Sequence, residues 1–144
     1  MSKKVLVAYD GSELSIKALE EAKNQINLIP DLELHVLSVV TVGGPTTNIA
    51  IARSIAKEIS ENLEPEMEEL HNNLEAEGIK NTSKVALDYI HNNPGFKLCE
   101  YAEENNIDLI ILGSRGLGDV KKLILGSVSN YVVQHAKCQV LIVK

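Results

Sequence analysis

Several features that would place this chain in a common functional class are scarce or missing. It has two cysteines, Cys99 and Cys138, which form no C-x-x-C pair, so we expect reduced core thiols. No apolar run approaches the roughly 18 residues of a membrane span, and no signal peptide precedes the first predicted strand. Lysine and arginine number 14 against 20 acidic residues, a net charge of −6 that argues against non-specific nucleic-acid binding. We therefore expect a cytoplasmic protein with no membrane and no nucleic-acid partner.

Three familiar site motifs are missing as well. No Gly-Lys-Ser/Thr closes a P-loop. Gly113, Gly116 and Gly118 are spaced wrongly for the dinucleotide fingerprint and follow a late strand. No serine has a histidine and a carboxylate at recognisable positions, so no hydrolase triad is indicated. His35 falls inside a predicted strand, and we expect it to be a histidine whose hydrogen bonds are satisfied within the fold.

The pattern of apolar residues predicts five strands that alternate with four helices. Continuous apolar runs such as Lys4–Tyr9 are typical of parallel strands that are covered on both faces. The predicted strands are residues 4–9, 34–40, 85–89, 107–112 and 139–143. The alternation predicts one α/β domain over residues 1–144, a three-layer sandwich around a five-stranded parallel sheet.

The longest predicted helix lies between the second and third strands. Pro65 falls inside it and is expected to kink it or to split it in two. Its expected buried stripe is Ile51, Ile55, Ile59, Leu63, Met67, Leu70 and Leu74.

The most distinctive stretch runs from Gly113-Ser-Arg-Gly116 to Gly126-Ser-Val-Ser129, between a predicted strand and a predicted helix. Glycines there let the backbone turn tightly and let a ligand approach closely. Ser127 is a natural N-cap, and the start of a helix attracts anions through its free N–H groups and its dipole. We interpret the stretch as a phosphate loop, whose cations Arg115, Lys121 and Lys122 could reach phosphates.

Asp10 is the second element of the candidate site. With a flavodoxin-like strand order of 3-2-1-4-5, ligands bind where the order reverses, between strands one and four. Strand one ends at Asp10 and strand four at Gly113, so the carboxylate is expected beside the glycine loop. There it could accept hydrogen bonds from ribose hydroxyls or help to hold a metal. The alternative is a turn residue within Asp10-Gly-Ser12.

These residues resemble a known family. Val5–Ser12 is similar to the opening of universal stress protein domains. Gly113-Ser-Arg-Gly116, nine residues and Gly126-Ser127 resemble the nucleotide loop of that family's ATP-binding branch. The resemblance runs the full length of the chain. It implies the winding of adenine nucleotide alpha hydrolase-like folds, a homodimer, and binding of ATP or a related adenine nucleotide with Mg or Mn.

The resemblance also implies roles for individual residues. Asp10 would meet the ribose, the backbone of Ala8 would lie near the base, and Val39 would offer backbone groups to the adenine edge. The other implied nucleotide-binding residues are Gly113, Gly116, Gly126, Ser127, Val128 and Ser129. We add Leu112 and Arg115 as candidates for the same site. The chain departs from the family at Ile90–Asn93, where a glycine is usual before the proline. It departs again at Ser38–Val40, where His-Val is common.

The sequence leaves more than one function open. A nucleotide-dependent regulator in a stress response fits best, because no general base is placed to activate a water. A slow ATPase is the first alternative. The second is a receiver-like phosphoacceptor, which needs an acidic cluster that Asp88–Tyr89 alone does not supply.

The last predicted strand is expected to form the homodimer contact. Val140–Val143 is too apolar for an open sheet edge and would pair with its own copy, antiparallel. In that arrangement Leu141 is expected to present its N–H to the edge.

Overall fold

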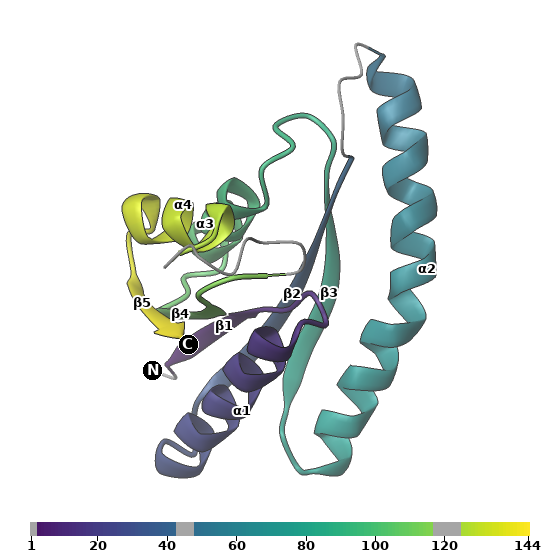
Figure 1. Cartoon of the computed structure of the whole chain (residues 1–144). Coiled ribbons are helices and arrows are strands. Elements are labelled where there is room, and N and C mark those ends of the chain that lie inside the picture. The colour runs from purple at the N-terminus through teal and green to yellow at the C-terminus, as the bar shows by residue number, and fades with distance from the viewer. Residues whose placement is uncertain (1–2, 43–47, 117–124) are drawn as a thin grey trace.

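The computed structural model describes residues 3–42, 48–116 and 125–144. Within them, strands and helices alternate along the chain, as the sequence predicts (Figure 1). The elements are β1 (Lys4–Ala8), α1 (Glu13–Leu28), β2 (Glu33–Thr41), α2 (Ile49–Ala76), β3 (Asn81–Asp88), α3 (Pro94–Glu104), β4 (Leu109–Gly113), α4 (Ser127–His135) and β5 (Gln139–Val143). None of the described helices is long and apolar enough to cross a membrane.

The sheet has the order β3-β2-β1-β4-β5, and every neighbouring pair is parallel. The predicted fold class and strand order are therefore confirmed. The predicted third strand begins too late, because β3 pairs with β2 from Asn81 onward. Residues 81–84 are polar, so no apolar run marks the first half of this strand.

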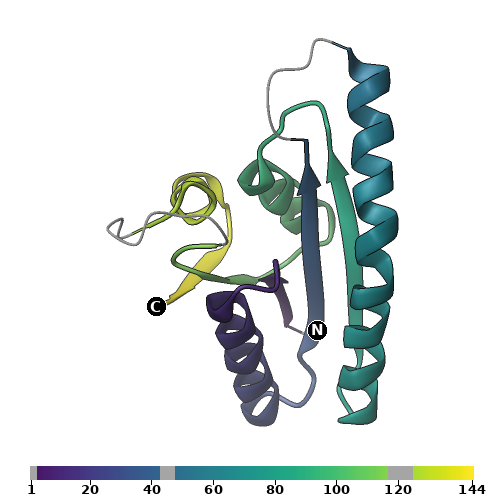
Figure 2. The ribbon, with the colours of Figure 1, turned by 45° about the vertical axis from the view of Figure 1, so that its right-hand side comes forward.

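Helices cover both faces of the sheet (Figures 1 and 2). On one face Val5 and Val7 of β1 pack in a core with residues of α1 and α2. On the other face Leu6 packs with Leu98 of α3 and Val132 of α4. Successive strand residues point to opposite faces, so a strand covered on both sides needs an unbroken apolar run.

The two cysteines and His35 lie in or beside the core between the sheet and helices α3 and α4. Cys99 and Cys138 are free and half-buried, and burial raises the pKa of Cys99 to about 11. Its thiol is therefore protonated at neutral pH. His35 is buried, with its Nδ1 2.7 Å from the Tyr101 hydroxyl and its Nε2 2.9 Å from Glu33 Oε1. The expectation that its hydrogen bonds are satisfied is confirmed.

Pro65 does not split α2, which continues through it as one element of 28 residues. The expected buried stripe, however, is wrong for the first half of this helix. Its buried stripe in the N-terminal half is Ala52, Ala56 and Ser60, one position after the predicted isoleucines. Ala52 and Ala56 pack on Val40 and Val42 of the β2 end. Small helix residues let α2 lie close to these bulky strand residues, which turns the isoleucines outward.

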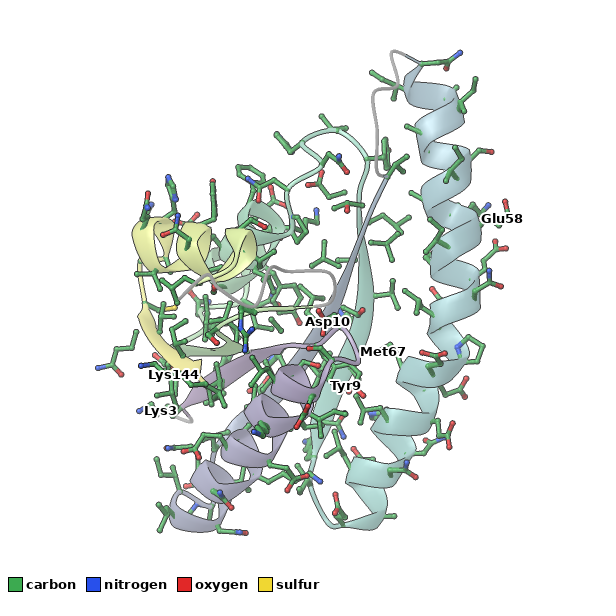
Figure 3. The ribbon with its side chains drawn as sticks, viewed as in Figure 1. Lys3, Tyr9, Asp10, Glu58, Met67 and Lys144 are labelled. Atoms are coloured by element: carbon green, nitrogen blue, oxygen red, sulfur yellow. The ribbon has the colours of Figure 1, made fainter. Side chains whose placement is uncertain are left out.

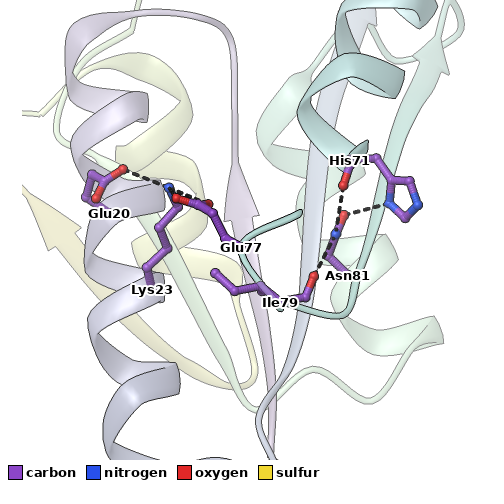
Figure 4. Close-up of polar contacts among 6 residues, drawn as sticks. All are labelled: Glu20, Lys23, His71, Glu77, Ile79 and Asn81. Atoms are coloured by element: carbon purple, nitrogen blue, oxygen red, sulfur yellow. Dashed lines mark hydrogen bonds and ion pairs between the residues drawn. The ribbon is translucent and has the colours of Figure 1, made fainter. Parts of the chain in front are cut away.

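Polar contacts hold the lower end of α2 against its neighbours (Figure 4). The Lys23 ammonium of α1 lies 3.1 Å from both Glu20 and Glu77, and so links α1 to the residue that caps α2. At the start of β3, the Asn81 amide donates to the carbonyl of Ile79 at 3.1 Å, and its oxygen lies 2.9 Å from His71 Nδ1.

The connection from β3 to α3 is shaped by the Asp88 carboxylate. Buried Asp88 accepts hydrogen bonds from the N–H groups of His91 (3.0 Å) and Asn93 (2.9 Å). Asn92 adopts a φ of 52°, a conformation that asparagine tolerates better than most residues. Asn93 then caps α3 through the N–H of Phe96. The chain thus makes this turn without a glycine.

Asp88→Asn should destabilise the protein at neutral pH by about 1–3 kcal/mol, the cost of leaving a buried donor without its charged acceptor. Burial alone would raise the pKa of Asp88, but the N–H donors of Asn93 and His91 outweigh it and hold that pKa below its ordinary value. A lowered pKa stabilises the fold above the unfolded value of about 3.9, and the contribution is lost as pH falls from there through the folded value.

Urea unfolding at pH 7 and at about pH 3 measures this difference. Asp31→Asn, at an exposed position after α1, is the matched control and should change little. A penalty of Asp88→Asn that stays the same in acid would contradict the role assigned to the charge.

Candidate functional site

A cavity of about 420 Å³ opens at the carboxyl ends of β1, β2 and β4. This is the point at which the strand order reverses, where open α/β sheets bind ligands. Among the predicted site residues that the structure describes, all except Gly126 line it. These lining residues are Ala8, Asp10, Val39, Leu112, Gly113, Arg115, Gly116, Ser127, Val128 and Ser129.

Sequence reasoning missed other residues of the wall. They are Tyr9, Ser12, Ser15, Leu37, Thr41, Pro94 and Leu98. Pro94 and Leu98 come from α3, whose start lies across the cavity from α4. Their pattern in the sequence is that of an ordinary amphipathic helix, so nothing in it distinguishes them from core residues.

The side of the cavity next to β2 is apolar, and one residue there directs both its N–H and its C=O into the cavity. The Tyr9 N–H donates to the carbonyl of Leu37 at 3.0 Å, just after the last paired residues of β1 and β2. Alternate residues of a parallel strand direct both backbone groups to the same side. Val39 therefore directs its N–H and C=O past the end of β1, into the cavity. A donor and an acceptor beside apolar side chains can recognise the edge of a planar base.

Asp10 and Gly116 lie next to each other in the wall of the cavity. Asp10 Oδ1 accepts a hydrogen bond from the Ser12 N–H at 2.9 Å, which orients the carboxylate. A Cβ at Gly116 would lie 2.6 Å from Asp10 Oδ2, so any larger residue would require this carboxylate to shift. The predicted proximity of Asp10 to the glycine loop is confirmed. The hydrogen bond from Ser12 shows that Asp10 is a turn residue as well, so the turn interpretation and the ligand-site interpretation are compatible.

Hydrogen bonds join the two ends of the glycine loop. The N–H of Gly126 donates to the carbonyl of Ser114 at 2.7 Å. The Ser129 hydroxyl donates to the same carbonyl at 2.7 Å and lies 3.2 Å from the carbonyl of Gly126. The Ser129 hydroxyl thus ties the two ends of the loop together. This contact joins residues 15 positions apart, and the sequence did not predict it.

The start of α4 faces the cavity without a side-chain cap. The N-cap is Gly126, so the expectation that Ser127 caps this helix is wrong by one residue. Glycine has no side-chain oxygen for the N–H groups of the first turn, and Ser127, Val128 and Ser129 of that turn line the cavity. A helix start of this kind offers N–H donors and positive dipole charge to an anion.

Charged side chains near the loop are few in the described part of the chain. Half-buried Arg115 lines the cavity, whereas Lys121 and Lys122 lie outside the described residues. Asp10 is the carboxylate among the lining residues. No group of three or more His, Cys, Asp or Glu able to hold a metal occurs among the described residues.

Known proteins share this sequence and this architecture. The sequence model of the Universal stress protein family matches residues 1–144. The chain is 32% identical to universal stress protein YxiE of Bacillus subtilis over the full length of both. Universal stress protein UspA from Lactobacillus plantarum has a TM-score of 0.83 at 23% identity, covering 99% of this chain and 97% of that one.

Two further solved structures of similar fold contain adenine nucleotides. A universal stress protein family protein from Arabidopsis thaliana, with AMP bound, has a TM-score of 0.67 at 22% identity, covering 99% of this chain and 91% of that one. A universal stress protein in complex with cAMP has a TM-score of 0.64 at 24% identity, covering 99% of this chain and 96% of that one.

Proposed function

This chain belongs to the universal stress protein family, and on that basis we propose that it binds ATP in the cavity described above. We propose further that it acts as a nucleotide-dependent regulator of a stress response in the cytoplasm. One observation carries the proposal: the uncapped start of α4, Asp10 and the open backbone groups of Val39 line a single cavity. The structural neighbours with AMP and cAMP support an adenine nucleotide as the ligand.

Each part of the cavity suits one part of the nucleotide. The base would lie on the apolar side, with its edge at the N–H and C=O of Val39 and the backbone of Ala8 nearby. The ribose hydroxyls would donate to Asp10. The phosphates would lie against Gly113, Gly116 and Gly126 and the first turn of α4, and backbone N–H groups with Arg115 would supply the donors.

A magnesium or manganese ion would fit this arrangement. Magnesium is usually bound by one or two carboxylates together with substrate phosphates and water. As the alternative to its ribose contact, Asp10 would supply one carboxylate to the ion, and the phosphates of ATP would supply the remaining anionic oxygens. The ion would neutralise phosphate charge next to a chain whose net charge is −6.

We assign binding rather than catalysis to the site. No histidine or glutamate is among the residues that line the described cavity, so no lining group is suited to deprotonate a water apart from Asp10. Asp88, which a receiver-like phosphoacceptor would use, is engaged by two backbone N–H groups and is not a lining residue. Phosphate release that Asp10→Ala abolishes would show a slow ATPase instead.

Two measurements test the ligand. Mass spectrometry of small molecules released from the purified protein should find ATP or another adenine nucleotide. Calorimetric titration with ATP, AMP and cAMP should then show saturable binding. Binding should be tightest for ATP, because only its three phosphates can fill the whole phosphate loop while its ribose contacts Asp10. Failure of all three to bind would overturn the proposed function.

Asp10→Ala should weaken ATP binding by about 1–3 kcal/mol, or roughly 5- to 150-fold, the range for hydrogen bonds to a charged group. Without ligand the melting temperature should change little, because Asp10 is exposed and the Ser12 N–H can turn to water. Calorimetry and thermal unfolding measure the two effects, with Asp31→Ala as the control. An unliganded protein that melts much earlier while its ATP affinity is unchanged would make Asp10 a purely structural turn residue.

We also infer that the protein forms a homodimer through β5. This strand ends the sheet, and its Val140 and Ile142 are half-buried in the single chain. An open edge strand of apolar residues favours antiparallel pairing with a second copy across a two-fold axis.

A further inference from the structure

One face of α2 carries bulky apolar side chains that the described part of the chain leaves uncovered. Ile51, Ile55 and Ile59 are exposed by 54%, 40% and 39%. They recur every four residues and so form a continuous line on the helix surface, here called the isoleucine stripe. Figures 1 and 2 show this N-terminal half of α2 extending beyond the end of α1, with no helix beside it on that face of the sheet.

The stripe is not required by the core of the molecule. Ala52 and Ala56, on the adjoining side of the helix, are fully buried and make the contact with β2. A helix needs one apolar side to pack on a sheet, and α2 has a second one. A second apolar side on a surface helix is typical of a docking surface.

The same face of α2 is acidic. Each residue advances a helix by about 100°, which places Glu66 and Glu69 in line with the stripe and Glu58 at its flank. None of these three glutamates forms an ion pair within the described chain. Figure 3 shows Glu58 projecting from the outer side of α2, away from the sheet.

No cation of α2 shares this face. Arg53 and Lys57 lie about 160° around the helix axis from Ile55. The isoleucine stripe and the glutamates therefore form a surface that is apolar along the stripe and negative at its flank, where Glu58 lies, and below it, where Glu66 and Glu69 lie.

We propose that this face of α2 docks a cationic amphipathic helix of a partner protein. The partner's apolar side would cover the isoleucine stripe, and its lysines or arginines would meet Glu58, Glu66 and Glu69. Helices that bind in this way are read through apolar anchors three or four residues apart, which is the spacing of the stripe. The net charge of −6 would steer a cationic segment toward the protein.

Charge decides against the other occupants. A second copy packed face to face across a two-fold axis would bring the same surface, which no cation of α2 shares, and so would leave the glutamates without an opposite charge. Anionic lipid surfaces and nucleic acids would be repelled by the same carboxylates. The proposal is independent of nucleotide binding.

A synthetic peptide of about 18 leucines and lysines, spaced as an amphipathic helix, serves as the probe. Fluorescence anisotropy of the labelled peptide with the full chain, at physiological salt, should show saturable one-to-one binding. A peptide with glutamates in place of the lysines should not bind, because it carries the same charge as the face.

Two sets of variants locate the binding. The double change Ile51→Gln and Ile55→Gln should weaken binding about tenfold or more, since each isoleucine would otherwise be covered by the peptide. Glutamine favours helix, so α2 should be retained. The triple change of Glu58, Glu66 and Glu69 to Gln should weaken binding and reduce its dependence on salt. Leu28→Gln, at a residue of α1 that is 79% exposed, is the matched control and should leave the affinity unchanged.

Three results would overturn the proposal. The first is an affinity for the peptide that does not change when Ile51 and Ile55 are replaced, or that falls as much in Leu28→Gln. The second is self-association of the unmodified chain that Ile51→Gln with Ile55→Gln abolishes in sedimentation, which would assign the face to a second copy. The third is binding to lipid vesicles that the same double change abolishes.

Discussion

Gly116→Val is expected to lower the affinity for ATP by about 100-fold or more while the protein stays folded. A Cβ at this position would already lie 2.6 Å from Asp10 Oδ2, and valine adds two methyl groups beyond it. The side chain would displace the Asp10 carboxylate and keep phosphates from the loop backbone. Gly116 follows β4 and is exposed, so the core should not change. Calorimetry measures the affinity, and circular dichroism with thermal unfolding measures the fold.

Gly116→Val could lower the affinity by displacing Asp10 or by blocking the phosphates, and making the same change in the Asp10→Ala protein separates these two causes. In Asp10→Ala the clash with the carboxylate disappears, so Gly116→Val should cost nothing further if it acts only through Asp10. A further fall in affinity would show that the valine blocks the approach of the phosphates, because the two effects then act on different parts of the nucleotide. Undiminished ATP affinity in a folded Gly116→Val protein would contradict the phosphate-loop interpretation.

Ile142→Pro is expected to convert the proposed homodimer into a folded monomer. The carbonyl of Val143 accepts from the Ser114 N–H at 2.8 Å, so Val143 directs its backbone groups to β4. Because the direction alternates along a strand, the backbone N–H and C=O of Leu141 also point to β4. Those of Val140 and Ile142 point to the open edge. The expectation that Leu141 presents its N–H to the edge is therefore wrong. Proline at 142 removes a donor of the contact, and its ring blocks a neighbouring strand, which should weaken dimerisation by about 100-fold or more.

Two controls accompany this variant. Ile142→Val keeps the N–H donor and should remain a dimer. Leu141→Pro should break the pairing of β4 with β5 and lower the melting temperature. Sedimentation velocity over a range of concentrations measures the assembly. A monomeric unmodified chain at high concentration, or an Ile142→Pro protein that is still dimeric, would contradict a contact through β5.

The sequence predicts most of this fold because its strongest signals are local. The unbroken apolar runs of β1 and β4 mark strands covered on both faces, and the alternation with helices requires parallel pairing. The first half of β3 was missed because the polar residues 81–84 pair only with β2 and have no apolar pattern of their own.

The buried side of α2 shows where a local pattern is ambiguous. Ile51, Ile55 and Ile59 share one helical spacing, and Ala52, Ala56 and Ser60 share the same spacing one position later. Hydrophobicity favours the isoleucines as the core. The bulk of Val40 and Val42 beneath the helix favours the small residues, and close packing prevails because the chain must fill the space without clashes.

The sequence by itself determined the α/β class, the placing of the glycine loop and Asp10 at the carboxyl ends of the strands, and the family resemblance. Only the tertiary structure decided which backbone groups open into the cavity, that Gly126 rather than Ser127 occupies the N-cap position of α4, and that Ser129 bonds to the Ser114 carbonyl across the loop. It also decided that Ile142 rather than Leu141 faces the sheet edge. Composition and spacing act within one element, whereas these features depend on the register between elements, and a shift of one residue reverses the direction in which a group points.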